Sequence, residues 1–149
     1  MEDPTLLHNV HQRAVFEYWM AARTSDDIPP PSRIDPVDLP RGSLPSIVVK
    51  ECEPESGRYR TRLAGTAFRE ATGFDSTHSY SDQISGNTGT VDRFNWAVAN
   101  RRPYWYQGPL AFSLRNFKQY SVLVLPFAEL GGPIARLLCV LDFEPDASP

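Results

Sequence analysis

Three successive segments in the last third of the chain have the composition of β-strands, and this run constrains the fold more than any other feature. The segments span residues 104–112, 119–127 and 134–143 and are rich in aromatic and β-branched side chains. Glycine and proline punctuate them, at Gly108-Pro109 within the first segment and at Gly131-Gly132-Pro133 before the last. Because strands joined by short turns pair antiparallel, we expect these three to form an antiparallel meander.

Two further strands are predicted earlier in the chain, at residues 46–53 and 58–63. The first contains the run Ile47-Val48-Val49 and is followed by a turn rich in proline and glycine. The second alternates strictly, with Tyr59, Thr61 and Leu63 on one face and Arg58, Arg60 and Arg62 on the other. Charged side chains protect an edge strand from pairing with another chain, and we favour this interpretation over an anion-binding stripe.

The N-terminal segment is predicted to be a helix that opens at Asp3-Pro4, an N-cap followed by proline at the first helical position. No helix-breaking residue follows until about Arg23. Its apolar residues recur at helical spacing, at Leu7, Val10, Ala14 and Tyr18, with Phe16 and Trp19 extending the surface. Such a face packs either onto the rest of the domain or onto a second copy, so a homodimer through this helix is one expectation.

Helices are also expected between the two groups of strands. One covers residues 66–71 and begins at Thr66, and the other carries Val91, Phe94 and Val98 at helical spacing. The 149 residues therefore describe one α+β domain with a five-stranded sheet. We divide the chain into an N-terminal helix (1–24), a proline-rich ordered connector (25–45), a core (46–144) and a disordered tail (145–149). Within the connector, Asp35-Pro36-Val37-Asp38 predicts a single helical turn.

Composition excludes several classes of protein. A net charge of −3 argues against a nucleic-acid-binding protein, which usually presents a basic surface. The N-terminus lacks the pattern of a secretory signal, and no apolar stretch approaches the roughly 20 residues of a membrane span, so we expect a cytoplasmic protein. The two cysteines, Cys52 and Cys139, lie alone in apolar strands and are predicted to be buried free thiols.

No motif of an enzyme or a metal site stands out, and we expect no enzyme. His8 and His11 have no third ligand at a suitable spacing and are interpreted as surface residues. The segment Gly86–Thr90 lacks the lysine of a P-loop and is interpreted as a loop that leads into a helix.

Aromatic residues are concentrated between positions 94 and 120. Aromatic side chains with polar tips suit the walls of a small-molecule pocket, although most such clusters are core. Phe94 and Phe112 favour the core, whereas Trp96, Tyr104 and Tyr106 fall where a helix meets the sheet. We take Trp96, Tyr104 and Tyr106, with the neighbouring Phe94, as the candidate ligand-binding residues.

Several short motifs, in order, resemble a family of small, single-domain bacterial PAS-like proteins known from alphaproteobacteria. The resemblance extends from about Val15 to Phe143. It is carried by Tyr18-Trp19, Pro31-Ser32-Arg33, Ile34-Asp35-Pro36, Leu44-Pro45, Tyr59-Arg60-Thr61-Arg62-Leu63-Ala64-Gly65-Thr66, Leu125-Pro126 and Leu137-Leu138-Cys139-Val140-Leu141-Asp142-Phe143. It implies an antiparallel sheet of strand order 2-1-5-4-3 with helices on one face and an extra N-terminal helix.

The resemblance also implies a stand-alone sensory or regulatory domain of bacterial signal transduction, which acts through a small molecule or a signalling partner protein. PAS folds hold haem, flavin, a metabolite or nothing, and this family has no generally assigned cofactor or catalytic residue. Two departures fall on the expected cavity side: Ser76-Thr77-His78 replaces a Leu-Thr-Gly, and Cys139 replaces a glycine. A ligand-free adaptor is the alternative function, and a small acid–base enzyme is a third.

Overall fold

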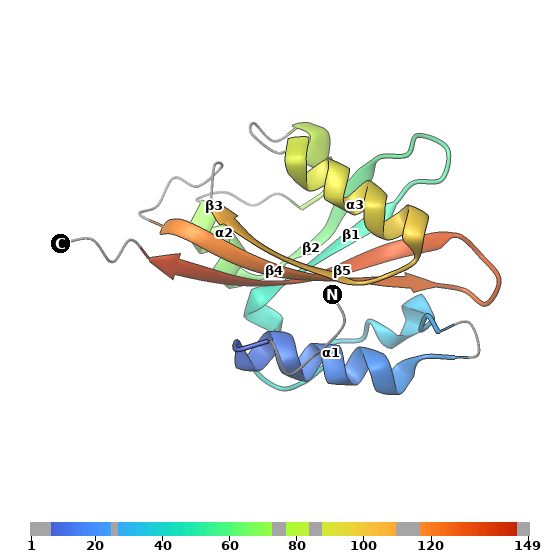
Figure 1. The fold of residues 1–149 in the computed structure, drawn as a ribbon, viewed down its shortest axis with the longest axis horizontal. Helices are drawn as coiled ribbons and strands as arrows, with labels where there is room; N and C mark the ends of the chain where they lie inside the picture. Colours follow the sequence, from blue (N-terminus) through green and yellow to red (C-terminus); the bar gives the residue numbers. More distant parts are fainter. Residues whose placement is uncertain (1–6, 25–26, 73–76, 84–87, 110–116, 146–149) are drawn as a thin grey trace.

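The computed structural model of the chain describes residues 7–24, 27–72, 77–83, 88–109 and 117–145. Five strands form one antiparallel sheet of order β2-β1-β5-β4-β3, which confirms the predicted topology (Figure 1). The strands are β1 (Ile47–Cys52), β2 (Tyr59–Ala64), β3 (Tyr104–Pro109), β4 (Phe117–Ala128) and β5 (Ile134–Pro145). The expected continuation of β3 through residue 112 lies outside the described residues.

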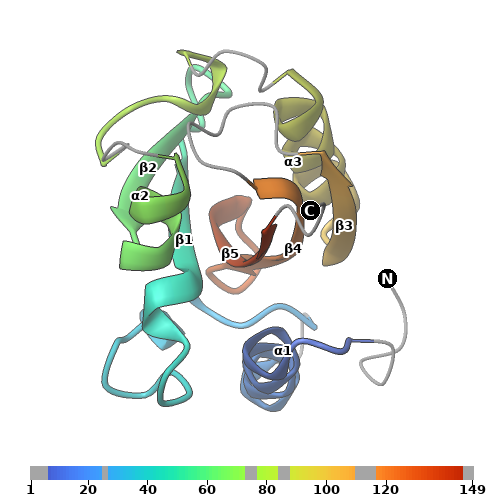
Figure 2. The ribbon, with the colours of Figure 1, turned by 90° about the vertical axis from the view of Figure 1, so that its left-hand side faces the viewer.

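Helices cover both faces of the sheet. Helix α1 (Val10–Ala22) lies on one face, and helices α2 (Thr66–Thr72) and α3 (Thr88–Asn100) lie on the other (Figures 1 and 2). Three short 3-10 turns, at Pro31–Arg33, Leu44–Ser46 and Ser81–Gln83, complete the connections. The sheet is thus buried on two sides, which explains the nearly continuous apolar run of strands β4 and β5.

The pleat of the three inner strands assigns their side chains to one face or the other. On β4, Tyr120 and Val122 point toward α3, whereas Ser121 and Leu123 point toward α1. Strand β5 follows the same alternation, with Cys139 and Leu141 on the α3 side. Two separate layers of core therefore lie above and below one sheet, and each face can carry its own polar group.

Helix α1 differs in two ways from the helix that the apolar spacing predicts. It begins later in the described residues, and a different side of it packs against the sheet. The expected opening at Asp3-Pro4 lies outside the described residues, and within them the helix starts at Val10, where the Asn9 side chain accepts hydrogen bonds from the N–H groups of His11 and Gln12. Val10 is 70% exposed, and the buried face consists of Gln12, Val15, Phe16 and Trp19. The bonds that Gln12 and Trp19 make to the sheet set this rotation.

The connector between α1 and β1 has the expected helical turn. The N–H groups of Asp38 and Leu39 both donate to the carbonyl of Asp35, while the Asp35 carboxylate accepts from the N–H of Val37. Leu39 is buried, so the turn is held by packing against the core as well as by its own hydrogen bonds.

Strand β2 departs from its strict alternation at Leu63, which is 42% exposed, while the next residue, Ala64, is buried. The consecutive β1 residues Val49 and Lys50 pair with Leu63 and Thr61, so Arg62 is an extra, unpaired residue in β2, and this bulge turns Leu63 away from the face that Tyr59 shares. A strict apolar–polar alternation in the sequence does not show where a strand contains a bulge.

Residues 78–80 cover the outer edge of β2. The N–H of Thr61 donates to the Ser79 carbonyl, and the N–H of His78 donates to the Thr61 carbonyl. Of the arginines, Arg58 forms a bidentate pair with Asp82 at 2.9 and 3.0 Å, and Arg62 lies 3.5 Å from Glu51. These side chains are engaged with neighbours along the edge, in keeping with the edge-protection interpretation.

Candidate functional site

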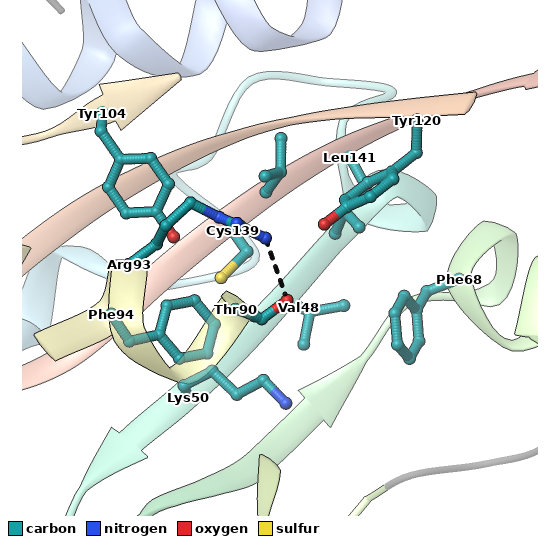
Figure 3. A pocket seen from close by; sticks show the side chains of 11 residues that line it. Val48, Lys50, Phe68, Thr90, Arg93, Phe94, Tyr104, Tyr120, Cys139 and Leu141 are labelled. Carbon is teal, nitrogen blue, oxygen red and sulfur yellow. Dashed lines mark hydrogen bonds between the residues drawn. The ribbon is translucent and has the colours of Figure 1, made fainter. Parts of the chain in front are cut away.

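A small cavity lies between the sheet and helices α2 and α3, on the face opposite α1 (Figure 3). Its volume is about 40 Å³. Every strand except β2 contributes to its wall, and so do both helices. The described residues that line it are Val48, Lys50, Phe68, Thr90, Arg93, Phe94, Tyr104, Tyr120, Val122, Cys139 and Leu141.

Lys50 brings a cation into this apolar wall from the middle of β1. It is only 5% exposed, and its Nζ donates to Thr61 Oγ1 at 2.7 Å. Among the described residues it forms no ion pair. Burial lowers the pKa of Lys50 to about 8, with a smaller opposing effect from Cys139, so the ammonium form still predominates at neutral pH.

Arg93 brings a second cation to the cavity from α3. Its guanidinium stacks over the ring of Tyr106, with the central carbon 3.6 Å from the ring centroid, and its Nη2 donates weakly to Thr90 Oγ1 at 3.3 Å. Its buried Nε has no hydrogen-bond partner in the described part of the chain. A guanidinium held by stacking on one side keeps donors available on the other.

Two tyrosine hydroxyls complete the polar lining. Tyr104 is 8% exposed, and no described group forms a hydrogen bond of ordinary geometry with its hydroxyl. Burial raises the pKa of Tyr104, and nearby Arg93 opposes that shift. Burial likewise raises the pKa of Tyr120, against the opposing effect of Thr90 and Arg93. Both phenols are therefore neutral donors near pH 7.

Cys139 lines the cavity from β5 and is buried, as expected from the sequence. Burial raises the pKa of its thiol to about 12, so it is a neutral, unreactive group at physiological pH. Cys52 is half-buried and has its pKa raised to about 12 for the same reason. Neither thiol has the low pKa of a nucleophile.

The cavity is too small for a large cofactor. Pockets for drug-sized ligands have volumes of about 300–1,000 Å³. A cavity of about 40 Å³ does not accommodate a haem or flavin with the side chains placed as they are. It holds about three water-sized groups, on the scale of about 10–15 Å³ for each.

The structure separates the four aromatic residues predicted from the sequence. Phe94 and Tyr104 line the cavity, whereas Trp96 and Tyr106 are not among the described lining residues. Trp96 is 45% exposed and meets the Tyr104 ring edge to face, with the two ring centroids 6.3 Å apart. Tyr106 instead supports Arg93 and packs against Tyr120. Of the two departures from the family motifs, Cys139 lies in the cavity wall and His78 is exposed at the edge of β2.

Sequence reasoning missed the cations of the site. Lys50 occupies the same face of its strand as Val48 by simple alternation, and this was the available signal for its burial. Arg93 precedes the buried Phe94 on α3. Its position in the cavity depends on how α3 packs on the sheet, which the local sequence does not show. The hydroxyls of Tyr104 and Tyr120 reach the cavity from the two paired strands β3 and β4.

A buried polar junction lies on the opposite face of the sheet, beneath α1. Gln12 is 1% exposed; its Nε2 donates to Ser121 Oγ and to the Val140 carbonyl, both at 3.1 Å. Its Oε1 accepts from Trp105 Nε1 at 3.2 Å. Trp19 adds a bond of 2.8 Å to the Pro126 carbonyl. Helix α1 is thereby joined to strands β3, β4 and β5 by specific hydrogen bonds.

The described part of the chain shows neither a metal-ligand cluster nor a membrane-spanning helix. Within these ranges, histidine, cysteine and acidic side chains form no group of three that could hold a metal ion. No helix in the same part of the chain is long and apolar enough to cross a membrane.

Comparison with known proteins identifies the family. A profile described as a PAS domain matches residues 7–83, just over half of the 149 residues, and the chain therefore belongs to the PAS-domain family. No curated protein matches the sequence significantly.

Among solved structures, the chain is similar to the light-state structure of the LOV domain of Aureochrome1, a blue-light photoreceptor. The two are 13% identical in sequence, with a TM-score of 0.51 over 70% of this chain and 84% of that one. At this identity the similarity concerns the fold alone.

Proposed function

We propose that this PAS domain is a sensory and regulatory module of signal transduction. A small molecule in the cavity above the sheet biases the packing of helix α1 below it, and a partner protein responds to that change. Family membership supports a sensory domain, and the cavity with its unpaired buried donors supports a ligand.

The observation that carries this proposal is the relation between the cavity and Gln12. Each residue that Gln12 contacts lies between two residues of the opposite face on its own strand. Ser121 lies between the lining residues Tyr120 and Val122, and Val140 lies between Cys139 and Leu141. Trp105 follows the lining residue Tyr104 and precedes Tyr106.

Movement of a strand toward or away from a ligand therefore changes the distances on which the Gln12 bonds depend. Hydrogen bonds weaken steeply as distance and angle depart from their optimum, so small strand shifts suffice to favour or disfavour the docked helix. In this proposal, the docked and the loosened helix α1 are the two states whose balance a ligand shifts.

The test is a two-dimensional NMR screen of the full chain, uniformly labelled with ¹⁵N, against a library of small carboxylates, amides and alcohols. We expect at least one compound to shift the amides of the cavity strands and, together with them, the side-chain amide of Gln12 and the indole N–H of Trp105. A compound that shifts the cavity amides while both junction signals stay fixed would contradict the coupling. A library without any binder, together with a native mass spectrum free of retained ligand, would contradict the sensor.

A ligand-free adaptor is the second candidate, and the small volume of the cavity favours it. In that case the domain binds its partner with a filled core, and no small molecule affects the complex. The same screen separates the two functions because an adaptor yields no shifts in the cavity.

The partner and the location are part of the proposal. We infer a signalling protein as the partner and the cytoplasm as the location, where free thiols such as Cys139 persist. A homodimer through α1 would use the outer face of the helix, near Val10, Arg13 and Glu17, because the apolar face is packed against the sheet. Sedimentation equilibrium of the full chain and of Val10→Asp decides it; a dimer that persists unchanged in the variant would exclude this surface.

A further inference from the structure

The cavity carries two cationic side chains and, among the described residues that line it, no acidic one. Within the described ranges, Lys50 donates to the Thr61 hydroxyl and forms no ion pair, while Arg93 stacks on the Tyr106 ring and donates to the Thr90 hydroxyl. Charges in such surroundings are usually paired, because an uncompensated buried charge loses its hydration. The chain as a whole has a net charge of −3, so the charge of the cavity lining is opposite in sign to that of the whole chain.

Unused hydrogen-bond donors accompany the two charges. The Tyr104 hydroxyl and the Arg93 Nε are buried and have no partner in the described part of the chain. Buried donors without acceptors are rare in native proteins, and an absent acceptor is one of the standard explanations. Figure 3 shows Arg93, Tyr104, Lys50 and Tyr120 around the same space, on four different elements. An acceptor with negative charge would satisfy these donors and compensate the nearby cations.

The remainder of the wall limits the size and shape of that group. Five of the lining residues are aliphatic or phenylalanine side chains: Val48, Phe68, Phe94, Val122 and Leu141. A volume of about 40 Å³ admits about three water-sized groups. A charged head with a short hydrocarbon tail satisfies both the donors and the apolar wall.

We propose that the cavity binds a short-chain monocarboxylate, with the carboxylate held by Lys50, Arg93 and the Tyr104 hydroxyl and the alkyl tail against the apolar wall. This inference rests on the sensory function proposed above and names its ligand class. The carboxylate accepts hydrogen bonds from all three groups and compensates the two charges at once.

The experiment is an NMR titration of the full chain with sodium acetate in a carboxylate-free, low-chloride buffer at pH 7. We expect a dissociation constant of about 1 mM, in line with the limited affinity of a four-atom ligand. Acetamide has the shape of acetate without its charge and is expected to bind at least about tenfold more weakly. Along the series formate, acetate, propionate and butyrate, affinity should rise with the first carbons and then be lost when the tail exceeds the cavity.

Variants identify the site of binding. Lys50→Met removes one charge in a side chain of similar length, and should weaken acetate binding at least about tenfold. Arg13→Gln is the matched control, since it removes a positive charge on the outer face of α1, where Arg13 lies 3.4 Å from Glu17. The control should bind acetate as the wild-type chain does.

The pH dependence is a second, independent readout. The Lys50 ammonium donates to Thr61 on β2, and the titratable and charged groups that share the cavity wall with Lys50 are Arg93 on α3, Tyr104 on β3, Tyr120 on β4 and Cys139 on β5. Burial raises the pKa of the two tyrosines and of the thiol above their usual range, whereas that of Lys50 is lowered to about 8. Acetate binding should therefore weaken by about tenfold per pH unit above that value.

The outcomes distinguish this inference from the function on which it rests. If acetamide binds as tightly as acetate, or acetate binds Lys50→Met undiminished, the anion site is wrong while a sensor for neutral ligands stands. Shifts confined to residues outside the cavity show adventitious binding and also overturn the anion site. The sensor itself fails only if the broader screen finds no ligand of any class.

Discussion

Replacing Lys50 and Thr61 together by apolar residues should make the protein more stable by about 2–3 kcal/mol at pH 7. The expected variant, Lys50→Met with Thr61→Val, removes a buried ammonium and the hydroxyl to which it donates. A lysine pKa lowered from 10.5 to about 8 corresponds to about 3 kcal/mol that disfavours the charged form in the folded chain. Apolar replacement of buried charged groups of similar volume is often stabilising.

The sign of the pH dependence follows from the same pKa. Between about pH 8 and pH 10.5 the folded chain has released the Lys50 proton while the unfolded chain still holds it, so this residue raises stability as pH rises. The advantage of the double variant should therefore be largest below pH 8 and fall below about 1 kcal/mol near pH 10.5. Urea unfolding followed by tryptophan fluorescence at several pH values measures it.

Single variants provide the control. Thr61→Val alone leaves the ammonium without its acceptor and should lower stability by about 1–2 kcal/mol. A double variant that is less stable than the wild-type chain at pH 7, with no pH dependence of the difference, would show that Lys50 is not a buried, poorly compensated cation.

Replacing Gln12 by leucine should destabilise the protein by about 2–4 kcal/mol and loosen helix α1 first. Leucine occupies a similar volume but leaves the Ser121 hydroxyl and the Val140 carbonyl buried without their partner. The Trp105 indole N–H also loses its acceptor, although at 41% exposure this group can turn to water. Hydrogen exchange should accelerate in α1 more than in strands β4 and β5.

The matched controls are an exposed neighbour and a compensating change. Arg13 follows Gln12 and forms an exposed ion pair with Glu17, so Arg13→Gln should change the free energy of unfolding by less than about 0.5 kcal/mol. Adding Ser121→Ala to Gln12→Leu should recover about 1 kcal/mol because it removes the orphaned hydroxyl. Equal acceleration of exchange throughout the sheet would contradict the view that Gln12 fastens this helix in particular.

The strands could be predicted from the sequence because each carries a local signal, whereas their order in the sheet was implied by the resemblance to the PAS-like family. Turn residues such as Gly131-Gly132-Pro133 separate β4 from β5, and the ordered motifs selected one topology among the possible meanders. The helical turn at Asp35 was equally visible because its hydrogen bonds join residues close in sequence. A single sequence predicts structure best where the interacting residues are close together along the chain.

The site could be predicted only in part because its groups come together through pairing over long distances. Gln12 precedes Val15 by three residues and Phe16 by four, so helical spacing predicts that all three share the buried face of α1. The sequence does not show which residues on β3, β4 and β5 bond to Gln12. Trp96 and Tyr106 were chosen for their aromatic character and lie outside the described lining, while Lys50 and Arg93 were overlooked as ordinary charges. A polar residue at a position that the periodicity of a strand or helix places on its buried face indicates a candidate site residue in such chains.

The pKa of Lys50 tests the proposed anion site most directly. The chain has only two lysines, Lys50 and Lys118, so selective labelling of lysine gives two side-chain signals to follow by NMR as pH is varied. In carboxylate-free buffer, Lys50 should titrate with a pKa of about 8, and saturating acetate should raise that value by about one pH unit or more. A Lys50 pKa at the ordinary 10.5, or one that acetate leaves unchanged, would contradict the anion site.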